Sequence, residues 1–293
     1  MMETVLENMK KQKVNKLSAN LGRRRMFSGF MITLTVISMI LALTPLFSIL
    51  GYVIVKGFSA LNLAFFTELP APPGEAGGGM ANGIIGTFTL ISLASAIGIP
   101  VGLMAGIFLS EYGRNRFGKL VSFLTDIMLG IPSIVIGIVV YALVVLAMGG
   151  FSAYAGGIAL AFIMIPAVTR TTEEMLKLVP NHIREAGLAL GIPKWRVIML
   201  IILPTALRGI ITGIMLAIAR VSGETAPLLF TAFGNMYWSQ SLNEPIASMP
   251  VLVFNYAISP YAEWQAQAWA GALTLILIVV VLNVSARLIT RKR

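Results

Sequence analysis

Residues 127–169 read IMLGIPSIVIGIVVYALVVLAMGGFSAYAGGIALAFIMIPAVT and contain no Asp, Glu, Lys or Arg. A helix that crosses a bilayer needs about 20 mostly apolar residues, so this stretch is too long for a single span. The cluster of Gly, Ser and Tyr residues at 149–157 offers a turn near its middle. We therefore predict two transmembrane helices here, at about 120–148 and 154–169.

The composition of the whole chain agrees with a membrane protein. Of its 293 residues, 57% are hydrophobic and 12% are charged, and the mean hydropathy is +0.86. A soluble domain is about 45–50% apolar and about 25% charged. A disordered chain has the opposite bias. Cysteine is absent and His182 is the single histidine, which excludes disulfides, thiol catalysis and multi-His metal sites.

Four further windows that are low in charge complete the pattern of spans. The first, 26–56, follows a basic tail at 1–25. It is no signal peptide, because its apolar stretch is too long and no small-residue cleavage site follows it. The others lie at about 83–109, 205–230 and 265–286. The sequence therefore predicts an all-α polytopic membrane protein with six transmembrane helices.

Small residues and prolines within the spans predict local features of the helices. Gly98, Gly102 and Gly106 form a small-xxx-small face, which is typical of close helix packing. Prolines are tolerated in membrane helices as kinks. We expect kinks at Pro100, Pro132 and Pro166, which are three of the prolines inside the spans.

The basic residues predict the orientation in the membrane. Of the 22 Lys and Arg residues, 19 lie in the N-terminal tail, the loops after the second and fourth spans, and the C-terminus. The alternate faces, 57–82, 149–153 and 231–264, contain none. Because positive charge marks the cytoplasmic side, both termini are expected in the cytoplasm. The same distribution argues against a nucleic-acid groove, so the expected surroundings are membrane lipid and no nucleic acid.

The motifs of common enzymes are absent. Gly113 and Gly118-Lys119 have the spacing of a phosphate-binding loop, but Leu120 stands where that motif requires Ser or Thr. The sequence contains no H-E-x-x-H and no G-x-S-x-G motif. We therefore expect that the chain is no enzyme and does not hydrolyse ATP itself.

The loop at 171–204 is rich in helix formers and has its own pattern. Residues 185–191 read EAGLALG, and they predict a short helix that ends at Gly191. Pro193 is suited to opening a second helix, and Pro204 is expected to break the chain at the membrane entry. The small residues of the first helix allow another surface to approach closely.

The same loop resembles the EAA loop, E-A-(A/G)-x3-G-x9-I-x-L-P, of permease subunits of ABC importers. The residues in register are Glu185, Ala186, Gly187, Gly191, Ile201, Leu203 and Pro204. The resemblance implies a type I (MetI-like) permease fold with a five-helix core at 83–287, and a coupling helix that docks on a separate ATPase. A generic amphipathic loop helix is the alternative.

The charged residues Arg220 and Glu224 lie deep inside the span at 205–230. A charge at mid-membrane costs about 3 kcal/mol on insertion scales and usually faces a bundle interior or an aqueous path. The i, i+4 spacing predicts that both lie on one helix face. Because arginine binds oxyanions through a planar fork of donors, the pair is a candidate for the substrate path. An ion pair that only fixes helix packing is the alternative.

The carboxylate of Glu224 favours one oxyanion over another. An ionised carboxylate accepts hydrogen bonds and donates none. Hydrogen phosphate carries a proton that it can donate, whereas sulfate at neutral pH does not. The pair is therefore better suited to phosphate than to sulfate.

Residues 220–229, RVSGETAPLL, resemble the R-x-x-G-E-T-A-P-L motif of permeases of phosphate-specific ABC importers, the PstA type, and 130–137, GIPSIVIG, are similar as well. This resemblance implies a heterodimer with a paralogous permease, two ATPase subunits and an extracytoplasmic phosphate-binding protein. It also implies that ATP and Mg are bound by the partner ATPase, so no cofactor is expected in this chain.

Two charges at helix ends carry further expectations. Arg170 ends the fourth span and is a candidate for the substrate path, with an arginine that merely extends to the interface as the alternative. Asp126 is expected to cap a helix or to pair with Lys119 or Arg170.

Three other functions stay open from the sequence. The first is an ABC permease for phosphonate, molybdate or sulfate. The second is a secondary transporter, which predicts internal repeats that the sequence does not show. The third is a membrane-embedded scaffold or sensor subunit.

Overall fold

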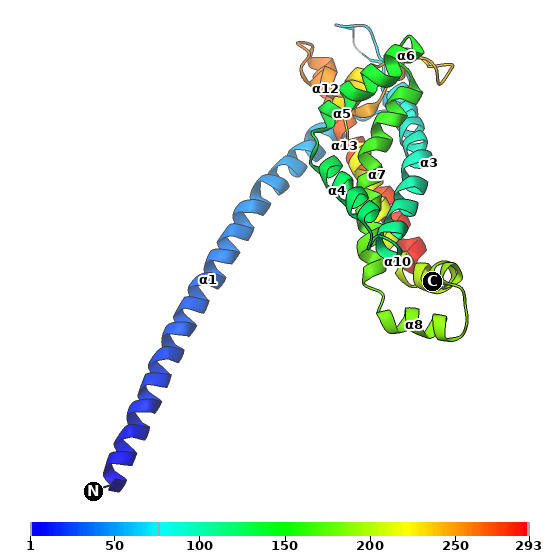
Figure 1. The fold of residues 1–293 in the computed structure, drawn as a ribbon. Helices are drawn as coiled ribbons and strands as arrows, with labels where there is room; N and C mark the ends of the chain where they lie inside the picture. The colour runs from blue at the N-terminus through cyan, green and yellow to red at the C-terminus, as the bar shows by residue number, and fades with distance from the viewer. Residues whose placement is uncertain (1, 76, 292–293) are drawn as a thin grey trace. The chain divides into compact units, whose positions relative to one another are not determined.

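The computed structural model describes residues 2–75 and 77–291, and within them the side chains of residues 24–75, 77–285 and 288. All regular structure in these residues is helical, which confirms the predicted all-α class (Figure 1). The elements are α1 (Met2–Ala60), α2 (Leu63–Thr67), α3 (Ala81–Glu111), α4 (Arg116–Gly130), α5 (Ser133–Val140), the π-helical η1 (Tyr141–Val145), α6 (Leu146–Met148), α7 (Ala153–Lys177), α8 (Asn181–Ala189), α9 (Lys194–Val197), the π-helical η2 (Ile198–Ile202), α10 (Leu203–Ser222), α11 (Ala226–Thr231), α12 (Met249–Ala257) and α13 (Ala262–Arg291).

The chain forms two compact units, residues 1–54 and 55–293. The helix α1 runs without a break through the first unit and ends in the second, so no break marks the predicted border between a basic tail and a first span. Its segment Arg24–Ala60 is long and apolar enough to cross a membrane, and its side chains from Met26 to Ile49 are exposed. An apolar helix exposed on every side is suited to lipid.

The second unit contains the remaining candidate spans. Four helical stretches are long and apolar enough to cross a membrane, namely Ala81–Glu111, Ala153–Lys177, Lys194–Ser222 and Ala262–Ser285. The pair α4 and α5–α6 passes the same test together but is bent by 106°. The described residues therefore hold five candidate spans, or six if the bent pair is one span, which is the predicted number.

The bend between α4 and α5 has a local cause at Pro132. Ile131, the residue before it, has an extended backbone with ψ 130°, as the proline ring requires. Pro132 itself has ψ 135°, which is not helical, and it is the N-cap residue directly before α5. The kink predicted at this proline is confirmed, whereas Pro100 and Pro166 lie inside the uninterrupted helices α3 and α7.

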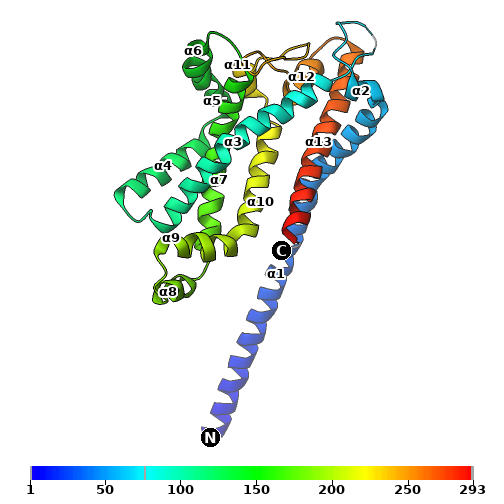
Figure 2. The same cartoon turned by 90° about the vertical axis from the view of Figure 1, so that its right-hand side faces the viewer.

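The helices α3 and α7 pack together more extensively than any other pair in the second unit (Figure 2). A Cβ added at Gly98 would lie 3.0 Å from a side-chain atom of Met164. At Gly102 it would lie 2.7 Å from Cβ of Val168, and at Gly106 the closest atom, 2.6 Å away, is Cβ of Thr172. The predicted close-packing face of glycines is therefore confirmed, and its partner is α7.

Two predicted boundaries are wrong. The helix α7 continues eight residues beyond 169, to Lys177, because helix formers follow the apolar stretch and the first stop signal is Pro180. Residues 171–177 of the predicted loop are therefore helical. The fifth span ends at Ser222 rather than near 230, because residues 223–225 leave the helix before α11 begins.

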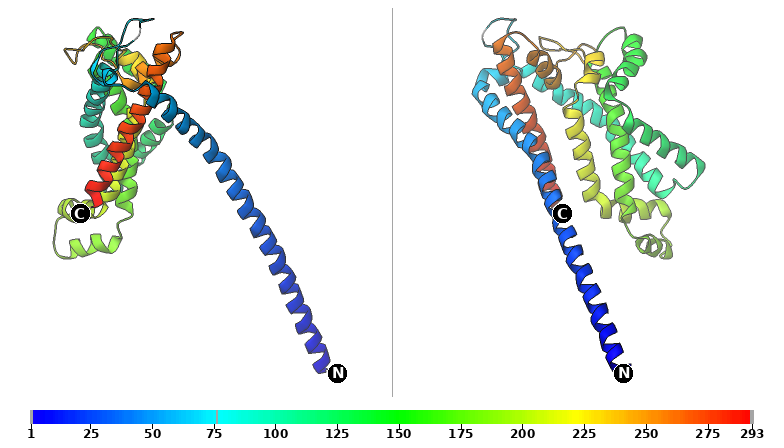
Figure 3. Two further views of the ribbon diagram at one scale, coloured as in Figure 1. Left: turned by 180° about the vertical axis from the view of Figure 1, so that it is seen from behind. Right: turned by 90° about the vertical axis from the view of Figure 1, so that its left-hand side faces the viewer.

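The second unit has two ends (Figures 2 and 3). One carries α8 and α9 and is called the α8 end below. The other carries α11 and α12 and is called the α12 end.

At the α12 end, Tyr256 is buried at 1% exposure and stacks on Trp264 with ring centroids 4.3 Å apart. Its hydroxyl has no hydrogen-bond partner among the described residues, and burial raises the pKa of Tyr256 to about 12.

We expect Gly102→Ala to weaken the α3–α7 contact. The added methyl group would meet Val168 and backbone at once, and overpacking of this kind costs about 1–3 kcal/mol. Thermal unfolding of the purified protein in detergent should shift to lower temperature. Gly51→Ala is the control, since a Cβ there meets nothing within 4 Å. An unchanged unfolding temperature for Gly102→Ala would contradict the proposed tightness of the contact.

We expect Tyr256→Phe to stabilise the α12 end by about 1 kcal/mol, because a buried hydroxyl without a partner is removed. The pKa of the tyrosine is higher in the folded state than its ordinary value, so wild-type stability should fall as the pH rises from about 10 to 12. The variant should lack this fall. Unfolding curves at pH 8 and pH 11 measure both effects, with the exposed Tyr261→Phe as the control.

Candidate transport path and coupling segment

The predicted charge pair lies where α10 ends. Nε of Arg220 is 3.9 Å from Oε1 of Glu224, and the side chains are 49% and 17% exposed. The predicted single helix face is wrong, because α10 ends at Ser222 between the two residues. A tight turn keeps them together, since the N–H groups of Gly223 and Glu224 donate to carbonyls of the last helical turn.

The guanidinium of Arg220 is largely unsatisfied within this part of the chain. Its ion pair with Glu224 is long, and no hydrogen bond of its side chain is found among the described residues. A half-exposed guanidinium with free donors is suited to binding an oxyanion in a bidentate manner. The geometry therefore leaves Arg220 available to a ligand.

The two sequence stretches that carry the phosphate resemblance meet in space. Gly137 of α5 lies so close to α11 that an added Cβ would be 2.6 Å from Cα of Pro227. Only glycine permits this approach of the two backbones. The stretch at 130–137 therefore supports the turn that holds Glu224, although the two are far apart in sequence.

Arg170 has the opposite environment. Its side chain donates to Asp126, to Glu173 at 2.5 Å and to Ser122 at 3.2 Å. Oε1 of Glu173 in turn binds Nζ of Lys177 at 2.6 Å. The predicted pairing of Asp126 with Arg170 is confirmed, and it joins α4 to α7. Because its donors are used within the protein, the geometry favours a packing role for Arg170, and its place in the path stays a prediction.

The predicted loop at 171–204 contains α8, α9 and η2, and these three elements, residues 181–202, form what we call the coupling segment. Gly191 follows α8 with φ +75°, its N–H donates to the carbonyl of Leu188, and the N–H of Ile192 donates to that of Gly187. These two bonds form a Schellman motif, which requires a left-handed residue and so favours glycine. The predicted helix end at Gly191 is confirmed, and Pro193 directly precedes α9 as expected.

The predicted break at Pro204 is wrong. The elements α9, η2 and α10 form one continuous helix through this residue. Proline has no N–H for the helix ladder, and its ring needs room beside the preceding turn. The wider π-helical turn at Ile198–Ile202 lies directly before it. The hydroxyl of Thr205 donates to the carbonyl of Ile201 at 2.6 Å and adds a bond at this point.

The residues at 185–187 of the EAA-like motif face in two directions. Gly187 is buried, and an added Cβ would lie 3.0 Å from Val197, so this glycine lets α8 pack against α9. Glu185 and Ala186 are exposed on α8, and Glu185 has no partner among the described side chains. Gly187 thus faces the inside of the segment, while the carboxylate of Glu185 faces outward. Leu203 is half-buried and Pro204 exposed at the start of α10.

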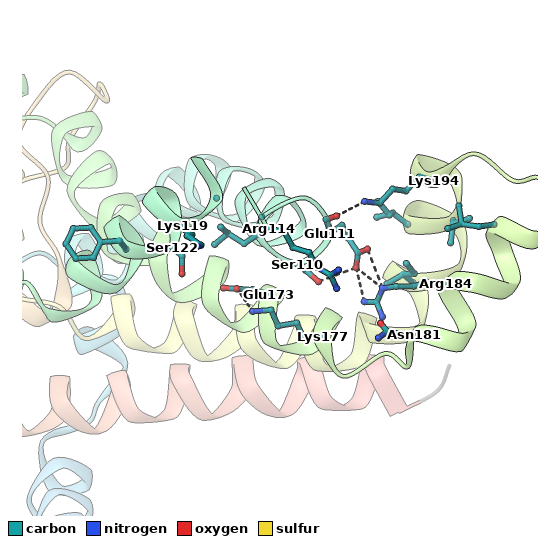
Figure 4. A pocket seen from close by; sticks show the side chains of 18 of the residues that line it. Ser110, Glu111, Arg114, Lys119, Ser122, Glu173, Lys177, Asn181, Arg184 and Lys194 are labelled. Atoms are coloured by element: carbon teal, nitrogen blue, oxygen red, sulfur yellow. Dashed lines mark hydrogen bonds and ion pairs between the residues drawn. The ribbon is translucent and has the colours of Figure 1, made fainter. Parts of the chain in front are cut away.

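A cavity of about 780 Å³ lies beside this segment (Figure 4). It is bordered by the ends of α3, α4 and α7 and by α8, α9 and η2. Its charged lining consists of Glu111, Arg114, Lys119, Asp126, Glu173, Lys177, Arg184 and Lys194. In the sequence, these cations indicate topology, and Lys119 is also an expected partner of Asp126, but no local pattern predicts the buried carboxylates Glu111 and Glu173. An acidic residue inside a basic segment is the signal that points to such pairs.

Comparison with known proteins agrees with this architecture. Residues 98–293 match the family described as the binding-protein-dependent transport system inner membrane component. The chain is 51% identical to the phosphate transport system permease protein PstA of Yersinia pestis over 271 residues, which cover 92% of each chain. It is 48% identical to the protein of the same name from Haemophilus influenzae, over 90% of this chain and 94% of that one.

Among solved structures, the fold is similar to an inward-facing form of the MetNI methionine ABC transporter. The TM-score is 0.56 at 18% identity, over 72% of this chain and 92% of that chain, so this likeness concerns the fold alone. It supports the predicted MetI-like permease fold. The matched region spans more than half of the sequence, and the chain therefore belongs to the family of binding-protein-dependent transport system inner membrane components.

Proposed function

We propose that this chain is a permease subunit of an ATP-driven importer that takes up inorganic phosphate across the plasma membrane. The observation that carries the proposal is the half-exposed guanidinium of Arg220, which has free donors beside the carboxylate of Glu224. The names of the relatives, which are phosphate transport permeases, support the same substrate. These names do not favour the alternative, a permease for phosphonate, molybdate or sulfate.

The pair binds and then releases the anion. Arg220 donates two parallel hydrogen bonds to phosphate oxygens, and its charge offsets that of the substrate. Because Glu224 lies 3.9 Å from the guanidinium, the empty site is neutralised without a tight bond that the substrate would have to break. Binding that is favourable but not tight suits a residue along a path.

Glu224 selects for a protonated anion. Its carboxylate accepts a hydrogen bond from hydrogen phosphate, whereas it repels the fully ionised sulfate. Most of this selectivity comes from the rejection of sulfate. Sulfate has no proton to donate, so the carboxylate of Glu224 would face a negative charge without a hydrogen bond. Glu224 is therefore the residue that separates phosphate from sulfate.

The α8 end faces the cytoplasm in this proposal, and both termini lie there, because the basic loops and tails mark that side. The coupling segment docks on a partner ATPase with Glu185, Ala186 and the exposed apolar residues of α8 and α9. ATP and Mg are bound and ATP is hydrolysed in that partner, so this chain needs no cofactor. A paralogous permease, two ATPase subunits and an extracytoplasmic phosphate-binding protein complete the importer.

Uptake by the reconstituted complex tests the proposal. Proteoliposomes that contain the purified complex, the binding protein and internal ATP should accumulate labelled phosphate. Unlabelled phosphate should compete, while excess sulfate or molybdate should not. Uptake that sulfate blocks and phosphate does not would overturn the substrate, and uptake that collapses with a proton uncoupler at constant ATP would indicate a secondary transporter.

We expect Arg220→Gln to lower phosphate uptake by about 30-fold or more, because the loss of a charged partner of a bound anion costs about 2 kcal/mol or more. The complex should still assemble, since the side chain of Arg220 makes no hydrogen bond and only one long ion pair among the described residues. Arg208→Gln is the matched control, as it places the same substitution at an exposed position of α10. Wild-type uptake by Arg220→Gln would show that Arg220 has no place in the path.

We expect Glu185→Lys to lower transport-coupled ATP hydrolysis by about tenfold or more, because charge reversal at a docking surface costs several kcal/mol. The permease should stay in the membrane, since Glu185 has no partner within the described chain. The matched control is Glu174→Lys, which reverses an exposed charge on α7. ATP hydrolysis and co-purification of the ATPase provide the measurements, and equal effects of the two variants would contradict a docking role.

A further inference from the structure

Glu111 is the last residue of α3, and its side chain is buried at 5% exposure. The carboxylate receives the guanidinium of Arg184 from α8. Nη2 of Arg184 donates to Oε1 at 2.8 Å, and Nε lies 3.2 and 3.4 Å from the two oxygens. The hydroxyl of Ser110 donates to the same carboxylate at 3.2 Å. The pair is therefore multiply bonded, with a buried carboxylate and a guanidinium that is 18% exposed.

The same guanidinium also holds the end of α7. Nη2 of Arg184 donates to the carbonyl of Leu176 at 2.7 Å, and Nη1 donates to that of Val179. These carbonyls belong to the last turn of α7 and to the second residue beyond its end, where helical partners run out. One side chain of α8 therefore binds the ends of α3 and α7 together.

A second bond joins the other arm of the coupling segment to the same residue. Nζ of Lys194, the first residue of α9, donates to the main-chain carbonyl of Glu111 at 2.6 Å (Figure 4). The ammonium also lies 4.0 Å above the ring of Tyr112. Glu111 thus receives α8 through its side chain and α9 through its backbone.

We propose that Glu111 is a positioning residue that fixes the coupling segment to the α3–α7 pair. This inference rests on the proposed function. The continuous helix α9–η2–α10 gives the partner ATPase one mechanical connection to Arg220, and Glu111 gives it a second connection, to α3 and α7. Because these two helices pack through glycines without room to slide, a displacement of α8 moves them as a body.

The neutral variant Glu111→Gln tests this role in the full reconstituted complex. It keeps the size of the side chain but removes the charge that Arg184 binds. We expect phosphate uptake to fall about fivefold or more while ATP hydrolysis persists, which is the lower range of coupling between sites. The number of phosphate ions taken up per ATP hydrolysed should therefore fall, and a change in stability alone would not alter this ratio.

Two further variants make the test decisive. Glu174→Gln is the matched control, because it makes the same substitution at an exposed position near the end of α7. Lys194→Met removes the bond from Nζ of Lys194 to the carbonyl of Glu111, while the Glu111–Arg184 pair stays intact. It replaces Glu111→Gln in the test if that variant does not assemble. We expect a smaller fall of the same ratio. A wild-type ratio in Glu111→Gln, or in Lys194→Met where it is needed, overturns the inference.

The two proposals fail in different ways. If the wild-type complex takes up no phosphate with ATP, the proposed function is wrong. If the wild-type complex transports phosphate and the Glu111 and Lys194 variants match it, only the positioning role is wrong.

Discussion

The second unit depends on the close approach of α3 and α7. Helices in lipid gain little from hydrophobic burial against one another, so van der Waals contact between backbones must hold them together. Gly98, Gly102 and Gly106 provide this contact over more than two turns. The helices α4, α5, α10 and α11 also pack on α7, which makes it the centre of the unit. A rigid central pair gives the charged residues at both ends fixed positions.

Two arginines in this framework differ in what remains of their hydrogen-bonding capacity. Arg170 is bound by Asp126 and Glu173, and both ends of its guanidinium are used inside the protein. Arg220 has one carboxylate at 3.9 Å and is half-exposed. Both occupy apolar helices, where an unpaired charge is costly. The two arginines therefore differ in their pairing. Arg170 holds helices together, whereas Arg220 has donors left for an anion.

Much of the architecture was predictable because its signals are local. Apolar length predicted the spans, glycine spacing predicted the α3 face, and Gly191 predicted the end of α8. The wrong predictions concern helix continuity. Helix formers extend α7 beyond its apolar part, and the π turn before Pro204 keeps a helix intact where proline alone predicts a break. The Glu111–Arg184 pair was missed because its members are 73 residues apart, and pairing at that range depends on tertiary packing.

The unbroken passage of the chain from α9 into α10 has a mechanical consequence. This helix has 29 residues, so at about 1.5 Å per residue it is about 44 Å long. If such a rod pivots by about 10° around its midpoint, each tip travels about 4 Å, comparable to the width of an oxyanion. Arg220 sits near one tip and Lys194 forms the other. If the proposed partner ATPase docks at the Lys194 end, a modest swing there is large enough to present or withdraw the guanidinium.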